Sequence, residues 1–276
     1  MRGIYAVRYL ASMPHHPVLF LVLLWAAVPV ALAQAPDPVP SAADTGVARD
    51  RPAQVRWWHV GAAVGSVAVI SLADHDLQRW VVDHRTQGQQ DLADVWQQWG
   101  EVRIPVGVTL GTIGAGLILH EPSVTRTGGR LATSLVAVTL LGRGMKKVVG
   151  RARPSEANGQ YTFDPFGSYN AFPSGHTITA FAFSATLADA IDNKWADIGL
   201  YTLAGGTGVS RMVGNHHWLS DVVAAAVLGT TVAKVVDGKW RIFGLRSPQF
   251  LTGPSGAGVG WTMDVPALRG ARSGQD

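Results

Sequence analysis

Residues 210–236, with the sequence SRMVGNHHWLSDVVAAAVLGTTVAKVV, join a polar cluster to an apolar segment and decide the fold. The apolar part, Val222 to Val236, consists of small and aliphatic residues and carries a single charge, at Lys234. A run of this length is too long for an ordinary strand and predicts a buried helix. The chain is therefore predicted to be an all-α helical bundle. Five further segments have a similar small-residue-rich, apolar character: 60–73, 104–119, 131–149, 177–190 and 196–213.

These segments also raise the question of a membrane. None contains eighteen uninterrupted, strongly hydrophobic residues, which is the usual signal of a spanning helix. Glycine pairs at 61/65 and 107/111 have the G-x-x-x-G spacing that lets helices approach closely in lipid. We expect several membrane spans, with a compact soluble bundle as the alternative. The more polar stretch 77–99 has apolar residues at helical spacing and predicts one amphipathic helix lying on a surface.

Composition narrows the function classes. Of the 276 residues, 47% are hydrophobic and 15% are charged. This composition suffices for one substantial helical core. Cysteine is absent, so disulfides and thiolate chemistry are excluded. The net charge is +4, but the basic residues are scattered except in the run 143–153, so nucleic acid is not the expected partner.

The chain divides into four expected regions. Residues 1–33 combine early arginines, an apolar stretch and an A-x-A site, and predict a signal peptide cleaved after Ala33, or an N-terminal anchor helix. Residues 34–56 are rich in proline, alanine and aspartate and are expected to form a flexible leader. Residues 57–237 form the helical domain. Residues 238–276 are expected to be a loosely ordered Gly/Ser-rich tail, with a short strand over 259–265 as the alternative.

A first polar cluster consists of Lys146 and, after six residues, Arg153-Pro154. If the helix continues to its proline, positions seven apart lie two turns apart on one face, so both cations would point the same way. The alternative is that the basic run 143–153 is an anchor that sets membrane topology.

A second cluster, Pro173-Ser174-Gly175-His176, directly precedes an apolar helix. Ser174 is a natural N-cap, and the backbone N–H groups that follow it have no partner within the helix. Such a helix start is suited to binding an anion, Gly175 allows close approach, and His176 adds a titratable donor. Taken alone, the cluster is equally a capped helix start with an incidental histidine.

A third cluster contains Ser210-Arg211, His217 and Asp221. On a helix, the i, i+4 spacing of the last two lets the carboxylate accept a hydrogen bond from one imidazole nitrogen. The other nitrogen is then free to act as a nucleophile. The neighbouring His216 lacks this spacing, so we expect His217 to be the reactive histidine.

Together the clusters provide the groups that phosphoryl transfer needs: positive charge around the phosphate, an in-line nucleophile and an acid for the leaving oxygen. Lys146, Arg153 and Arg211 supply the charge, His217 attacks, and His176 donates the proton. This scheme needs no metal and no cofactor, and the sequence has neither an H-E-x-x-H motif nor cysteine ligands.

At these residues the chain resembles the type 2 phosphatidic acid phosphatase superfamily, over roughly Leu131 to Val236. That superfamily includes membrane lipid phosphatases, soluble acid phosphatases and vanadium haloperoxidases, all with a helical-bundle core. The resemblance implies that Lys146, Arg153, Ser174, Gly175 and Arg211 hold the phosphate, that His217 is the nucleophile, that Asp221 orients it and that His176 is the acid.

The residues around Pro173 to His176 look more like the membrane members of the superfamily. The resemblance therefore implies a phosphatase for a lipid-linked phosphomonoester or diphosphate, in a bacterial inner membrane with its site facing the periplasm. Three alternatives remain open: a soluble periplasmic acid phosphatase, a vanadate-dependent haloperoxidase, and a non-enzymatic membrane scaffold.

Overall fold

The computed structural model describes residues 52–156, 159–243, 249–253 and 256–260. The expected signal peptide, at 1–33, and nearly all of the expected leader lie outside the described residues.

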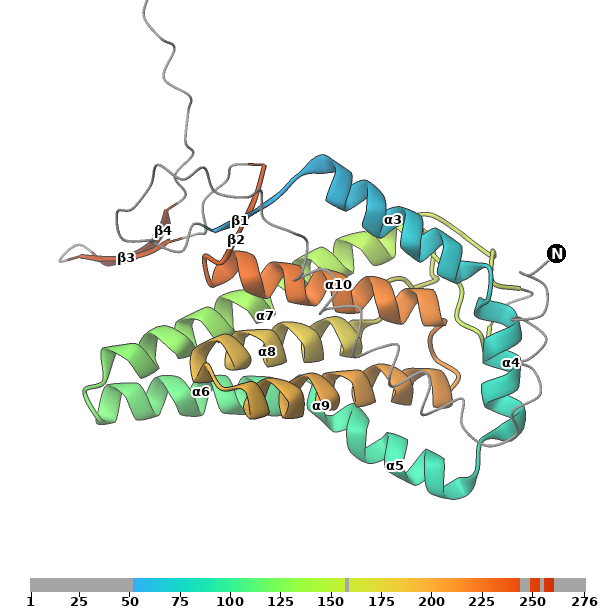
Figure 1. Cartoon of the computed structure of the whole chain (residues 1–276), viewed down its shortest axis with the longest axis horizontal. Coiled ribbons are helices and arrows are strands. Elements are labelled where there is room, and N and C mark those ends of the chain that lie inside the picture. Colours follow the sequence, from blue (N-terminus) through green and yellow to red (C-terminus); the bar gives the residue numbers. More distant parts are fainter. Residues whose placement is uncertain (1–51, 157–158, 244–248, 254–255, 261–276) are drawn as a thin grey trace, which may run out of the picture.

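Five of the described helices form the bundle that carries the site: α6 (Arg103–Ile118), α7 (Pro122–Val149), α8 (Gly175–Ile191), α9 (Lys194–Val213) and α10 (Leu219–Val236). Helix α8 lies at the centre and packs against α7, α9 and α10 (Figure 1). Its sequence is apolar on every side, and Phe181, Phe183 and Ile178 are almost completely buried, which is typical of a core helix. The prediction of an all-α bundle is confirmed.

The N-terminal part differs from the prediction of one amphipathic helix over 77–99. It contains α3 (Trp57–Ser71), α4 (Asp74–His84), α5 (Gln87–Gln97) and a short 3-10 turn, η1 (Gln98–Gly100). The break has a local cause, because Thr86 forms a capping box with Gln89 and so starts a new helix. Helix α4 contacts α10, and α5 lies along α9 (Figure 1).

Helix α7 also ends differently from the prediction. It stops at Val149, and Gly150 adopts the left-handed conformation with φ of 55°. A β-carbon at Gly150 would clash with the carbonyl oxygen of Asp164, so the close return of the chain requires glycine here. Arg153 therefore lies on a loop, not on the same helix face as Lys146.

The two ends of the domain are joined by a small parallel pair of strands, β1 (Ala53–Val55) and β2 (Trp240–Ile242). Beyond them, β3 (Gln249–Gly253) and β4 (Gly256–Gly260) form an antiparallel hairpin. Strand β1 thus lies within the expected leader, and the described residues of the expected tail include β2, β3 and β4. Strand β4 includes residues 259 and 260 of the alternative strand over 259–265, and residues 261–265 lie outside the described residues.

Within the described residues, two helical stretches are long and apolar enough to cross a membrane: Gln87–Ile118, which joins α5, η1 and α6, and Leu219–Val236. Trp57–Ser71 with Asp74–His84 would form a third span if this pair, bent by 54°, counts as one. The sequence predicted several spans without fixing their number. Helices α7 and α8 are not among the candidates, because α7 carries several charges and α8 has seventeen residues. Exposed aliphatic side chains on α3, α6 and α7, such as Val64, Leu110 and Leu140, are consistent with an apolar surrounding.

Candidate active site

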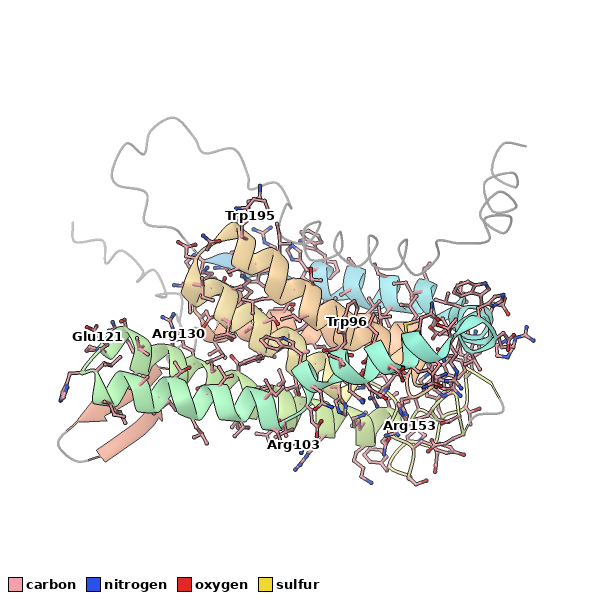
Figure 2. All side chains as sticks on the ribbon, turned by 90° about the horizontal axis from the view of Figure 1, so that it is seen from below. Trp96, Arg103, Glu121, Arg130, Arg153 and Trp195 are labelled. Atoms are coloured by element: carbon pink, nitrogen blue, oxygen red, sulfur yellow. The ribbon has the colours of Figure 1, made fainter. Side chains whose placement is uncertain are left out.

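All three polar clusters meet at one end of the bundle, where α7 and α9 finish and α8 and α10 begin. The N–H of Ser174 donates to the carbonyl oxygen of Asp221 at 3.2 Å, which joins the starts of α8 and α10. Figure 2 shows Arg153 at this end, whereas Glu121 and Arg130 lie at the opposite end. We call the first the site end and the second the far end.

Asn170 brings the first two cations together. The ammonium group of Lys146 donates to its backbone carbonyl, and Nε of Arg153 donates to its side-chain oxygen at 3.1 Å. The predicted convergence of Lys146 and Arg153 therefore occurs, but through a shared loop partner and not through a common helix face. Burial, together with the charges of Arg153 and Arg211, lowers the pKa of Lys146 to about 8.

The second cluster forms the start of α8 as expected, with Ser174 at the N-cap. The Ser174 hydroxyl does not cap the backbone; it lies 2.8 Å from the hydroxyl of Thr177. Helix geometry leaves the N–H groups of Gly175 and His176 without intrahelical acceptors. A β-carbon on Gly175 would lie only 3.8 Å from Cε of Lys146. An anion at this helix start therefore also meets the ammonium group.

Arg211 extends from the last turn of α9 and is 7% exposed. One guanidinium nitrogen, Nη1, donates to the side-chain oxygen of Gln97 at 2.7 Å. Its buried Nε has no hydrogen-bond partner among the residues that the structure describes. Gln97, in α5, is a contact that the sequence did not predict, and it leaves Arg211 with a donor available for an anion.

His217 lies in the turn before α10 and not on a helix with Asp221, so the predicted i, i+4 geometry is wrong. Its Nδ1 lies 3.7 Å from Oδ2 of Asp221. This separation is too long for a hydrogen bond. That oxygen accepts instead from the backbone N–H of Trp218 at 2.9 Å. The approach of the two groups is nevertheless correct, and His217 is 2% exposed whereas His216 is only partly buried.

The two site histidines are neutral near pH 7. Burial lowers the pKa of His217 to about 4, and Asp221 opposes this effect. Burial and the charge of Arg211 lower the pKa of His176 to about 4 as well. A neutral His217 is competent as a nucleophile, whereas a neutral His176 has to gain a proton before it can act as an acid.

Arg151 is the largest contributor that sequence reasoning missed, since it was assigned only to a basic anchor run. It is 3% exposed, and Nη1 donates to Oδ1 of Asp221 and to the hydroxyl of Ser220, both at 2.7 Å. Its Nη2 donates to Oδ2 of Asp74, in α4, at 2.8 Å. No local pattern distinguishes Arg151 from its basic neighbours, because its partners lie about 70 positions away in both directions.

Comparison with known families agrees with this geometry. The family model of the PAP2 superfamily matches residues 127–239, which include all three clusters. The matched part of the chain is thus similar to the PAP2 superfamily. The expected resemblance to type 2 phosphatidic acid phosphatases is therefore confirmed.

Curated relatives of the chain include lipid A 1-phosphatases. One, from Porphyromonas gingivalis, is 41% identical over 88 residues, which are 30% of this chain and 19% of that protein. Another, from Rhizobium etli, is 32% identical over 111 residues, which are 38% of this chain and 47% of that protein. The chain thus spans about a fifth of the first relative and about half of the second.

A solved PAP2 structure shares the fold. It is a transmembrane phosphatidylglycerolphosphate phosphatase from Bacillus subtilis, 19% identical, with a TM-score of 0.52. The match covers 64% of this chain and 93% of the other. At this identity the likeness establishes the common helical architecture.

Proposed function

We propose that the protein is a membrane phosphatase that hydrolyses a lipid-linked phosphomonoester or diphosphate through a phosphohistidine on His217. The observation that carries this proposal is the convergence of three cations and two neutral histidines at the site end. The match of residues 127–239 to the PAP2 superfamily supports the same reaction class.

The three cations provide the electrostatic part of the reaction. Lys146, Arg153 and Arg211 come from α7, the following loop and α9, so they approach the phosphate from different directions. The start of α8 adds backbone N–H groups. Such preorganised donors stabilise charge on the phosphoryl oxygens without a metal ion, and metal independence is part of the proposal.

In the first step, Nε2 of His217 attacks phosphorus in line with the leaving oxygen. A nitrogen–phosphorus bond forms, the phosphorus–oxygen bond to the lipid breaks, and the leaving oxygen takes a proton from His176. Attack requires that the His217 proton resides on Nδ1, on the side of Asp221. The 3.7 Å separation of Nδ1 from the carboxylate is then expected to shorten when substrate binds. Catalytic contacts often tighten in this way.

In the second step, water attacks the phosphohistidine. His176, now neutral, accepts a proton from the water, a new phosphorus–oxygen bond forms, and the nitrogen–phosphorus bond breaks. Inorganic phosphate leaves and His217 is regenerated. The same histidine thus acts as acid and then as base, which requires its pKa to rise from about 4 when the negatively charged substrate binds.

A lipid-linked substrate is supported by the apolar helices that surround the site end and by the lipid A 1-phosphatase relatives. Phosphatidic acid, a phosphatidylglycerol phosphate, a polyprenyl diphosphate and a phosphorylated glycolipid all present a phosphate on a membrane-anchored group. The proposal extends to this class and assigns no single member.

The decisive test compares His217→Ala with His216→Ala in purified, detergent-solubilised protein. Phosphate release from a panel of these lipids, with chelator present, should be lost in the first variant and retained in the second. Substrate carrying ³²P should label the wild type with an acid-labile, alkali-stable phosphoramidate. Activity in His217→Ala, or loss of wild-type activity with chelator, would refute the mechanism.

We also propose that the site end faces the periplasm of a bacterial inner membrane. Because the chain has no cysteine, single cysteines can report orientation without background. Ser155 lies on an exposed loop near Arg153, and Glu121 is exposed at the far end (Figure 2). A membrane-impermeant maleimide applied from the periplasm should label Ser155→Cys and leave Glu121→Cys unlabelled; the reverse pattern would refute this orientation.

A further inference from the structure

A buried set of charges lies directly behind the nucleophile. Arg151 is enclosed by protein, and each of its donor nitrogens has an acceptor: Nε donates to the carbonyl oxygen of Gln160, Nη1 to Asp221 and Ser220, and Nη2 to Asp74. The rings of Phe163 and Trp218 lie 5.8 and 5.5 Å from its guanidinium carbon. A planar guanidinium group with all its donors hydrogen-bonded fixes the positions of the carboxylates that it binds.

Asp74 completes the set from the other side. Its side chain is fully buried, although it comes from α4, far from the three sequence clusters. Oδ1 accepts the backbone N–H of Ser220 at 2.9 Å, and Oδ2 accepts the Ser220 hydroxyl as well as Nη2 of Arg151. Asp74 is thus hydrogen-bonded to the first turn of α10, which carries Asp221.

The arrangement determines which part of Asp221 is available to the histidine. Oδ1 is occupied by Arg151, and Oδ2 accepts the N–H of Trp218. A carboxylate oxygen can accept more than one hydrogen bond. The remaining capacity of Oδ2 faces Nδ1 of His217 at 3.7 Å. Rotation of the carboxylate would break the contacts with Arg151 and Trp218, so its orientation is fixed.

Charge balance explains why both residues are present. Arg151 alone would neutralise the charge of Asp221 and weaken its attraction for the imidazolium that develops as His217 attacks. Arg151 also binds Asp74 (Nη2 to Oδ2). With both carboxylates ionised, Asp74, Arg151 and Asp221 together carry one negative charge, the same as Asp221 would carry alone. Lys146 and Arg211 face His217 from α7 and α9, and they oppose its protonation.

We propose that Asp74 and Arg151 are positioning residues for the nucleophile, which fix Asp221 and preserve its charge so that it can orient His217. This inference rests on the proposed phosphatase function. It extends the functional set to Asp74, outside the residues 127–239 that match the PAP2 superfamily. It also gives α4 a role in the chemistry, since that helix supplies the balancing charge.

Two conservative variants test the proposal. Asp74→Asn keeps the shape and removes the charge; Arg151→Lys keeps the charge and removes the fork. Each variant should lower kcat about tenfold or more, which is the pattern expected when a residue that orients the nucleophile is lost. KM and inhibition by inorganic phosphate should stay within about twofold, because neither residue is among the proposed phosphate-binding residues. The rate of phosphoenzyme formation should fall with kcat.

Lys234→Gln is the matched control, because Lys234 forms another ion pair of α10, a partly buried one with Asp189 at the far end. It should lower thermal stability without changing kcat per folded protein. Wild-type kcat in both site-end variants, a change confined to KM, or failure of both variants to fold would overturn the proposal. If the wild type itself releases no phosphate from any lipid tested, the proposed function fails instead.

Discussion

The two ends of the bundle each bury a cluster of charges, but they satisfy those charges differently. At the site end, every carboxylate oxygen of Asp74 and Asp221 accepts a hydrogen bond. At the far end, Asp189 binds Lys234 and Lys239 through one oxygen, at 2.6 and 2.8 Å. Its other oxygen and both oxygens of Asp237 are buried without a hydrogen-bond partner in the described part of the chain.

This difference shows that the fold fixes the orientation of the carboxylates at the site end and leaves buried carboxylate oxygens without hydrogen bonds at the far end. A fully bonded network has one arrangement and holds its members in place. A buried carboxylate that accepts no hydrogen bond is relieved most simply by taking up a proton. Burial and the charge of Asp189 raise the pKa of Asp237 to about 7, and Arg130, 3.9 Å from Oδ1, opposes this rise. The Asp74, Arg151 and Asp221 network at the site end therefore fixes side-chain orientation, whereas the Asp189 and Asp237 pair at the far end takes up a proton near pH 7.

The largest expected effect comes from breaking the bonded network. Arg151→Met should lower the free energy of unfolding by about 3–5 kcal/mol, because it leaves two buried carboxylates without their countercharge. Lys234→Met should cost much less, about 1 kcal/mol, since Lys239 still binds Asp189. Denaturant unfolding of both variants in the same detergent measures the contrast. Equal losses would show that the two clusters are equivalent.

The next largest expected effect is a loss of stability in acid that is caused by buried His217 at the site end. The pKa of His217 is about 4 in the folded protein and near 6.5 when unfolded, so the unfolded chain binds more protons between these values. The contribution of His217 to stability should be fully present above pH 6.5 and should be lost toward pH 4, by about 3 kcal/mol at most. His217→Gln should reduce the slope of the unfolding free energy against pH between pH 6.5 and 4. The slope that remains is expected to come from His176 and His216. An unchanged slope in His217→Gln would contradict the assignment.

A smaller effect is expected from the turn that leads into the site. Gly150→Ala should destabilise the protein by about 2 kcal/mol, because alanine resists a positive φ and its β-carbon would meet the Asp164 carbonyl. Gly129, in the same helix but toward the far end, has nothing within 4 Å of the place that an alanine methyl would take. Gly129→Ala should therefore stabilise α7 by up to about 1 kcal/mol. Thermal unfolding of the pair should give shifts of opposite sign.

The smallest effect concerns the far end and has the opposite pH dependence from the histidines. The pKa of Asp237 is raised from 3.8 to about 7, so its folded form holds the extra proton and stability falls as pH rises through this range. Asp237→Asn should remove that loss and be more stable than the wild type by about 1 kcal/mol at pH 8. Unfolding midpoints at pH 5 and pH 8 measure it. A variant that is less stable at both pH values would show that Asp237 is charged and paired.

The sequence predicted the helices of the bundle and the order of the polar clusters, because both are local patterns. The break at Thr86 was also readable, since Thr86 and Gln89 have the capping-box spacing, but the apolar periodicity of 77–99 concealed it. The stop of α7 at Gly150 was similarly overlooked in favour of the proline that follows.

The residues that support the site from behind could not be predicted. Asp74, Gln97 and Arg151 acquire their roles only from partners about 70 to 146 positions away. Asn170 meets Lys146 and Arg153 only because the chain folds back after α7. Such long-range contacts leave no pattern in a single sequence, whereas each of the three clusters is a short motif that can be recognised locally.

The position of Asn170 has a consequence for turnover. Its two oxygens accept from donors of Lys146 and Arg153 that a phosphate would otherwise take. In the proposed reaction, an incoming phosphate has to compete with Asn170 for these donors, which lowers the affinity for substrate and product alike. In the proposed reaction, the two Asn170 oxygens bind the cations again when inorganic phosphate leaves, and this competition limits product inhibition.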